Sequence, residues 1–242
     1  MAEMGLGYGS EYQLMRYLGH HRNELNRIIK ENTKLNGELV WLDFPKDRKT
    51  DESKISLSLD GEYKGVDFMK GKIDKIKYES LQYNWKNYWS SGGNQPNWDG
   101  IILHRNGNNE EWIIVEAKAH LEEIESKTES ASNQKIQNAF RDTQKRFEIS
   151  NNNWFGKHYQ LANRLAFINF LLDNKINASL LYIYFINGYE KRELKDRKKI
   201  AIKNKSVKKQ EEWEKKIEEE YLNLGINDKA KQYISSAFID CK

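Results

Sequence analysis

The chain has 242 residues, a formal net charge of +4 and 31% charged residues, and it is long enough for one large domain with a substantial core. Because no stretch approaches roughly eighteen consecutive apolar residues and the N-terminus lacks a signal-peptide pattern, we expect a soluble, cytoplasmic protein without membrane contacts. The single cysteine, Cys241, excludes an internal disulfide and a cysteine-based zinc cluster.

The first third of the chain predicts a helix followed by an irregular β region. Ser10 and Gln13 form a capping-box pattern, and the apolar spacing after them predicts one helix from about Glu11 to Lys30. Glu11 begins the apolar stripe, so it either points inward from the helix N-terminus or simply satisfies the helix dipole. Residues 38–73 have the pattern of short strands separated by polar turns.

A helix and a β-hairpin are predicted next. The apolar side of Tyr78 to Trp89 predicts a helix that Gly92 and Gly93 terminate. Residues 97–118 read N-W-D-G-I-I-L-H-R-N-G-N-N-E-E-W-I-I-V-E-A-K, with β-branched and aromatic residues on both sides of an Asn-Gly-Asn-Asn turn. This pattern predicts two antiparallel strands.

Three charged side chains, Asp99, Glu116 and Lys118, are set into this apolar hairpin. Side chains alternate along a strand, so all three project from one face, and Asp99 lies opposite or diagonal to Glu116 depending on which turn residues form the loop. The alternative is an ordinary cross-strand salt-bridge cluster. We favour a functional site, because the second strand is apolar on its other face too, where unpaired charge is costly.

The residue types restrict the metal chemistry of such a site. Without cysteine ligands, and with five histidines that form no H-E-x-x-H or H-x-H pattern, a bound metal would need oxygen ligands. Oxygen ligands favour Mg²⁺ or Mn²⁺ over Zn²⁺.

Two helices and a strand are predicted after the hairpin. Apolar spacing predicts helices over residues 133–147 and 155–172, and the buried-type strand Ala178 to Ile186 should lie parallel to an earlier strand. The second helix also carries Gln160, Asn163 and Arg164, polar residues that either line a cleft or face solvent.

The C-terminal fifth of the chain is unusually charged. Residues 191–209 hold ten Lys or Arg against two acids, a pattern typical either of a solvated connector or of a phosphate-binding arm. A charged helix over residues 207–224 ends at Gly225. We expect residues 1–190 to form the core domain, including the 38–73 insertion, and residues 191–242 to be a basic arm and helix packed on it or extending from it.

Asp99 followed by Glu116-Ala117-Lys118 on the second hairpin strand resembles the D-x(n)-E-x-K signature of the PD-(D/E)xK nuclease superfamily. The patterns W-x-x-x-W-S-S-G-G-N-Q-P-N-W-D-G, V-E-A-K-A-H and Y-Q-L-A-N-R-L-A are similar to those of an uncharacterised bacterial branch. The resemblance covers residues 9–187 and implies a restriction-endonuclease-like α/β fold. That fold has an α-β-β-β-α-β core and a mixed central sheet flanked by helices, here with extra N-terminal strands and a charged C-terminal helix.

The resemblance implies a metal-dependent nuclease. Asp99, Glu116 and the Ala117 carbonyl would hold Mg²⁺ or Mn²⁺, Lys118 would stabilise developing charge, and Glu11 and Gln160 would complete the site. Some relatives carry a tyrosine four residues after that glutamine, where this chain has arginine, and Trp98 stands where the signature has proline. Candidate contacts to the nucleic-acid backbone are the following residues: Lys157, Arg164, Lys198 and Lys199.

The implied partner is nucleic acid, with DNA favoured over RNA, and a homodimer is one oligomeric state that the sequence allows. Two alternatives are a catalytically silent module that binds nucleic acid or protein on the same fold, and a subunit of a larger nuclease complex. The triad argues against a silent module, because binding alone does not require it.

Overall fold

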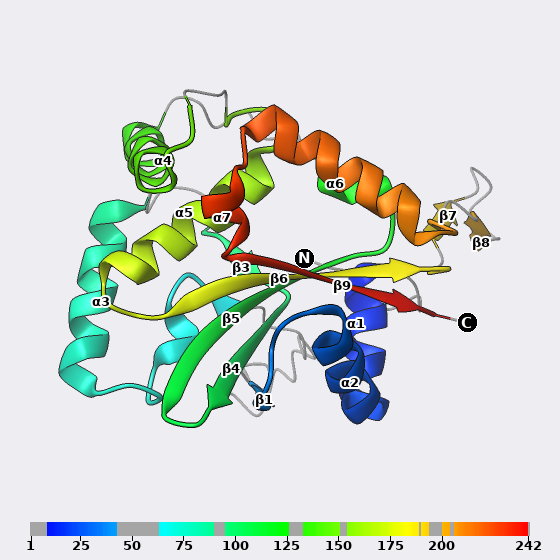
Figure 1. Cartoon of the computed structure of the whole chain (residues 1–242), viewed down its shortest axis with the longest axis horizontal. Coiled ribbons are helices and arrows are strands. Elements are labelled where there is room, and N and C mark those ends of the chain that lie inside the picture. The colour runs from blue at the N-terminus through cyan, green and yellow to red at the C-terminus, as the bar shows by residue number, and fades with distance from the viewer. Residues whose placement is uncertain are drawn as a thin grey trace, which may run out of the picture.

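The computed structural model describes residues 9–42, 63–89, 95–125, 133–150, 154–188, 190–193, 200–203 and 206–241. Within these ranges the protein is α/β, with a mixed five-stranded sheet between two layers of helices (Figure 1). This confirms the predicted fold class at the level of the mixed, helix-flanked sheet. In spatial order the sheet contains β1 (Glu38–Trp41), β4 (Gly100–Asn106), β5 (Asn109–Lys118), β6 (Ala178–Ile186) and β9 (Ile234–Asp240).

The hairpin has one of the two registers allowed by the sequence. Strand β4 pairs with β5 in antiparallel fashion, with Asn106 opposite Asn109, so Gly107 and Asn108 form the loop. Gly107 has a φ of 60°, which a glycine adopts without steric cost at the first position of a tight hairpin turn. The same register sets Gly100 opposite Val115 and brings Asp99, one residue earlier, level with Glu116.

The parallel half of the sheet includes one strand that the sequence did not indicate. Strand β6 lies parallel to β5, as predicted, with Tyr182 beside Glu116. Strand β9 then pairs parallel to β6 and forms the far edge. The chain after residue 206 therefore contributes a strand to the main sheet.

Seven α-helices and two short 3-10 helices lie in the described ranges. They are α1 (Ser10–His20), α2 (Arg22–Asn32), η2 (Asp67–Met69), α3 (Lys75–Tyr88), η3 (Leu121–Ile124), α4 (Gln134–Phe147), α5 (Tyr159–Asp173), α6 (Gln210–Leu224) and α7 (Asp228–Lys231). None of them combines the length and the apolarity needed to cross a bilayer.

The prediction of one N-terminal helix was wrong. The chain leaves helical geometry at His21, and Gly19, His20 and His21 form a run of weak helix formers at the break. The break lets Leu14 of α1 and Leu25 of α2 pack on the same face of the sheet. The predicted Ser10 cap was also wrong, because Gly9 is the N-cap and the Ser10 hydroxyl donates to Glu123.

Other helix ends differ by a few residues. Helix α3 begins earlier than expected because the Asp74 side chain accepts hydrogen bonds from two backbone N–H groups of its first turn. Helix α5 begins four residues later than predicted, at Tyr159. Gly92 and Gly93, most of the 38–73 region, and Lys198 and Lys199 lie outside the described residues.

The sheet separates two hydrophobic cores, and β5 contributes to both. Odd-numbered residues such as Ile113 and Val115 pack with α1 and α2, whereas Trp112 and Ile114 pack with α3 to α6. Two small two-stranded sheets accompany this core: β2 (Tyr63–Lys64) with β3 (Asn97–Trp98), and β7 (Glu190–Glu193) with β8 (Ile200–Lys203). Glu116 and Lys118 therefore face the layer of α3 to α6.

Candidate functional site

The predicted triad lies at the C-terminal end of β5. Glu116 and Lys118 are buried there, and Asp99 is partly exposed beside them at the entrance to β4. The backbone N–H of Ala117 donates to Asp99 Oδ2 at 2.8 Å. Lys118 Nζ donates to Glu116 Oε1 at 2.7 Å. The strand alternation and the hairpin register thus bring together the side chains that the sequence singled out.

Helix α5 adds two further predicted residues. Gln160 Nε2 donates to Glu116 Oε1 at 2.7 Å. Arg164 donates to Glu116 Oε2 through Nε at 3.0 Å and through Nη2 at 2.8 Å. The polar residues of this apolar helix therefore face the hairpin, because residues four apart lie on one side of a helix.

The two carboxyl groups have opposite electrostatic surroundings. Burial and the neighbouring charge of Glu116 raise the pKa of Asp99 to about 8. Burial alone would also raise the pKa of Glu116, but Arg164 and Lys118 outweigh it and hold that pKa below its ordinary value. Glu116 is the ionised member of the pair, whereas at Asp99 the charges of Lys118 and Arg164 do not offset burial and the charge of Glu116.

Lys118 remains a cation in this environment. Burial would lower the pKa of the Lys118 ammonium, yet Glu116 and Asp99 raise it above its ordinary value. A lysine in this state donates hydrogen bonds and stabilises negative charge, and it does not act as a base.

The site has the ligand chemistry of a hard-cation site. Asp99, Glu116 and the Ala117 carbonyl offer oxygen atoms, and the raised pKa of Asp99 is that of a carboxyl which a cation would ionise. The described residues hold no group of three or more His, Cys, Asp or Glu side chains arranged for a metal. Magnesium does not require such a group of three side chains. It commonly binds one or two carboxylates and completes its coordination shell with water and phosphate.

Two other predicted residues come from α1 and from the segment before α5. Glu11 sits in the first turn of α1, on the helix layer opposite to Glu116, so it would approach the carboxylates only around the end of β5. Lys157 is largely exposed and pairs with Glu125 at 3.7 Å. The structure therefore does not group Lys157 with the triad.

Sequence reasoning missed a buried acid from the C-terminal helix. Glu220 is 3% exposed, its Oε1 lies 3.7 Å from His158 Nδ1, and the charge of Lys118 lowers the pKa of its carboxyl. The signal was present, since Glu220 interrupts the apolar stripe Trp213, Ile217 and Leu224 of α6. Burial raises the pKa of the Glu220 carboxyl, and His158 opposes that rise.

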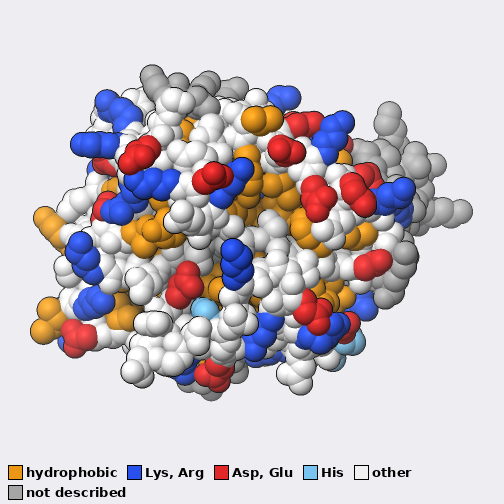
Figure 2. All heavy atoms as spheres, in the orientation of Figure 1, with side chains coloured by type: hydrophobic (Ala, Val, Ile, Leu, Met, Phe, Trp, Pro, Cys, Tyr) orange, Lys and Arg blue, Asp and Glu red, His pale blue; other side chains and the backbone are white. Residues whose placement is uncertain are grey.

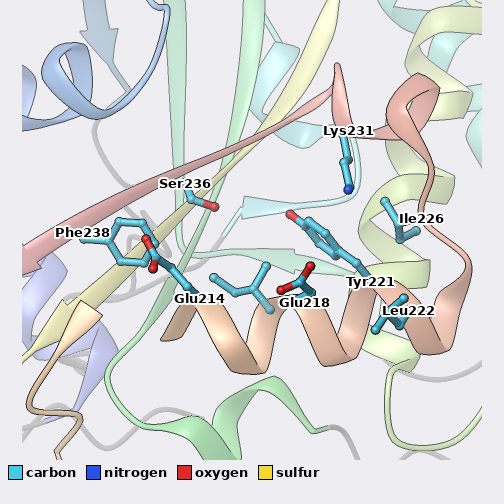
Figure 3. A pocket seen from close by; sticks show the side chains of 9 residues that line it. Glu214, Glu218, Tyr221, Leu222, Ile226, Lys231, Ser236 and Phe238 are labelled. Carbon is cyan, nitrogen blue, oxygen red and sulfur yellow. The ribbon is translucent and has the colours of Figure 1, made fainter. Parts of the chain in front are cut away.

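A surface groove lies on another side of α6. It encloses about 310 Å³ between α6, α7 and β9, and Figure 3 shows Tyr221, Leu222, Ser236 and Phe238 around it. None of the triad residues lines this groove. It is therefore distinct from the carboxylate site.

No protein-family model, curated protein or solved structure matches this chain.

Proposed function

We propose that the protein is a metal-dependent nuclease that hydrolyses phosphodiester bonds in nucleic acid, with DNA the favoured substrate. The observation that carries the proposal is the convergence of Asp99, Glu116, Lys118 and Gln160 at one strand end. The element order also supports a restriction-endonuclease-like core, because α1, β1, β4, β5, α5 and β6 occur in the chain order α-β-β-β-α-β, with α2, α3, α4 and shorter elements inserted between them.

Each side chain has a distinct task in the proposed reaction. Asp99, Glu116 and the Ala117 carbonyl would hold Mg²⁺ or Mn²⁺, which supplies Lewis acidity and lowers the pKa of bound water. Lys118, held protonated, would stabilise the charge that develops on the phosphate. The Gln160 amide would fix the orientation of the Glu116 carboxylate through its 2.7 Å hydrogen bond.

Cleavage assays on labelled single-stranded, double-stranded and branched DNA and RNA test the proposal. With Mg²⁺ or Mn²⁺ we expect cleavage of at least one substrate by the native protein, and a loss of roughly 10² to 10³ in rate for Lys118→Ala. The matched control is Lys77→Ala, because Lys77 is an exposed lysine on α3. Equal rates for native protein and Lys118→Ala would contradict the assignment of Lys118.

One observation favours a second candidate function, a catalytically silent module that binds nucleic acid or protein. Glu116 already accepts hydrogen bonds from Lys118, Gln160 and Arg164, so its charge is balanced by the chain itself. Binding of a labelled nucleic acid without any metal-dependent product across the same panel would favour that function.

A further inference from the structure

Several contacts hold the Arg164 side chain in place beside Glu116. Besides its two bonds to Glu116 Oε2, its Nη2 donates to the Asn97 carbonyl at 3.0 Å. The centre of its guanidinium lies 4.9 Å from the Trp98 ring, a cation–π arrangement, and the residue is 8% exposed. Such an arginine is held as a planar fork against one carboxylate oxygen, away from solvent.

The acceptor capacity of Glu116 is full in this arrangement. A carboxylate offers about four lone-pair sites. Lys118 and Gln160 each donate one hydrogen bond to Oε1, and Arg164 donates two to Oε2. A metal ion that binds Glu116 must therefore displace at least one of these donors.

Arg164 is the donor whose departure changes the site most. It alone occupies Oε2, so its withdrawal frees a whole oxygen, whereas loss of Lys118 or Gln160 frees only part of Oε1. Exchange of the guanidinium for a metal cation also keeps a positive charge beside the carboxylate. A buried carboxylate needs such a charge, because an unpaired buried charge is strongly destabilising.

We propose that Arg164 is the internal counter-cation of Glu116 and competes with the metal ion for that carboxylate. This inference rests on the proposed function and differs from the sequence-based prediction that Arg164 contacts the nucleic-acid backbone. Metal affinity of the protein without nucleic acid is accordingly held down by Arg164.

Manganese titration of the full chain without nucleic acid tests the competition directly. Free Mn²⁺ followed by electron paramagnetic resonance should show that Arg164→Met binds about tenfold more tightly than the native protein, a typical size for coupling between competing contacts. Arg164→Lys keeps the charge but loses the fork, so its affinity should lie between the two. Arg141→Met, an exposed arginine on α4, should match the native protein.

A double variant and a measurement on the native protein complete the experiment. Glu116→Gln added to Arg164→Met should abolish the gain in affinity. If Arg164→Met does not fold by circular dichroism, the native protein still decides, because the Nε–H resonance of Arg164 should shift on Mg²⁺ titration. A folded Arg164→Met with native or weaker Mn²⁺ affinity, or an unmoved Arg164 resonance at saturating Mg²⁺, would overturn the inference.

Failure of the proposed nuclease function would give a different set of results from failure of the Arg164 inference. In that case Arg164→Met would gain Mn²⁺ affinity while neither it nor the native protein cleaved any nucleic acid. If instead the native protein cleaves with Mg²⁺ and Arg164→Met shows no gain, only the role of Arg164 is wrong.

Discussion

At the scale of single residues, the site is a pair of carboxyl groups whose environments push their pKa values apart. Glu116 is ionised because Arg164 and Lys118 surround it, whereas at Asp99 the same two cations are outweighed by burial and by the charge of Glu116. Pairs of this kind occur where one fold assigns different tasks to identical groups. Because the two pKa values differ, the stability of the protein should depend on pH in a way that can be measured.

The pKa of Asp99 predicts a stability difference between the native protein and Asp99→Asn. A carboxyl whose pKa rises from 3.8 to about 8 on folding stabilises the folded state while protonated, and that stabilisation is lost as pH rises through this window. Asn is neutral at every pH and its side-chain oxygen can still accept from the Ala117 N–H. The melting temperature of Asp99→Asn relative to native protein should therefore rise between pH 4 and pH 8.

Melting curves by circular dichroism across that range check this prediction in metal-free buffer. Glu116 and Lys118, the groups coupled to Asp99, have a lowered and a raised pKa respectively and stay charged across this range, so the difference reports mainly Asp99. A difference in melting temperature that is constant from pH 4 to pH 8 would show that Asp99 titrates normally.

The residue pattern revealed which side chains share a face but not all of their partners. Asp99, Glu116 and Lys118 could be grouped because strand alternation and a hairpin turn are local signals. The bond from Arg164 to Glu116 joins residues 48 positions apart, and Glu220 arrives from a helix still later in the chain. Such partners depend on tertiary packing, which no spacing rule reports.

At the scale of elements, prediction succeeded where periodicity is strong and confined to one segment. Helix α4 and strands β4, β5 and β6 were expected close to their observed bounds because burial imprints periods of 3.6 or 2 on them. Strand β9 was missed, since its sequence I-S-S-A-F-I-D is short and partly polar and it forms by pairing with β6. The break at His21 was missed because apolar spacing continues across it.

Substitution of glycine by alanine should have different effects in the hairpin turn, at Gly107, and inside helix α1, at Gly19. Gly107→Ala should destabilise the protein by about 1 kcal/mol, because alanine is strained at a φ of 60°. An added Cβ meets no atom within 4 Å at either Gly107 or Gly19, so only the backbone differs. Gly19→Ala, inside α1, should be neutral or stabilising by up to about 1 kcal/mol.

Urea denaturation monitored by tryptophan fluorescence measures both variants. If Gly107→Ala unfolds at the same urea concentration as the native protein, the turn does not have the conformation on which the register of Asp99 and Glu116 depends.

At the scale of the whole molecule, the C-terminal segment is part of the central architecture. Strand β9 forms one edge of the sheet, and Trp213 of α6 is fully buried with its indole N–H donating to the Phe185 carbonyl. Glu220 of the same helix extends that integration to the candidate site. The segment from residue 206 onward therefore supports both the fold and the electrostatics around Lys118.

The surface charge is mixed on the face that Figure 2 shows. Described Lys and Arg side chains alternate there with Asp and Glu, and hydrophobic side chains are exposed between them. A basic band that would track a nucleic-acid backbone is not formed by the described residues of this face. The basic segment 191–209, for which the sequence left open a solvated connector or a phosphate-binding arm, lies largely outside the described side chains.

The central claim, hydrolysis at the Asp99 and Glu116 carboxylates, is tested most directly by the metal-dependent cleavage rate of Glu116→Gln. Glu79→Gln is the matched control, because Glu79 is exposed on α3 and pairs only loosely with Lys75 at 3.9 Å. With Mg²⁺ on the best substrate of the panel, Glu116→Gln should lose at least about a hundredfold in rate while Glu79→Gln keeps the native rate. Full cleavage activity in a correctly folded Glu116→Gln protein would contradict the assignment of this site.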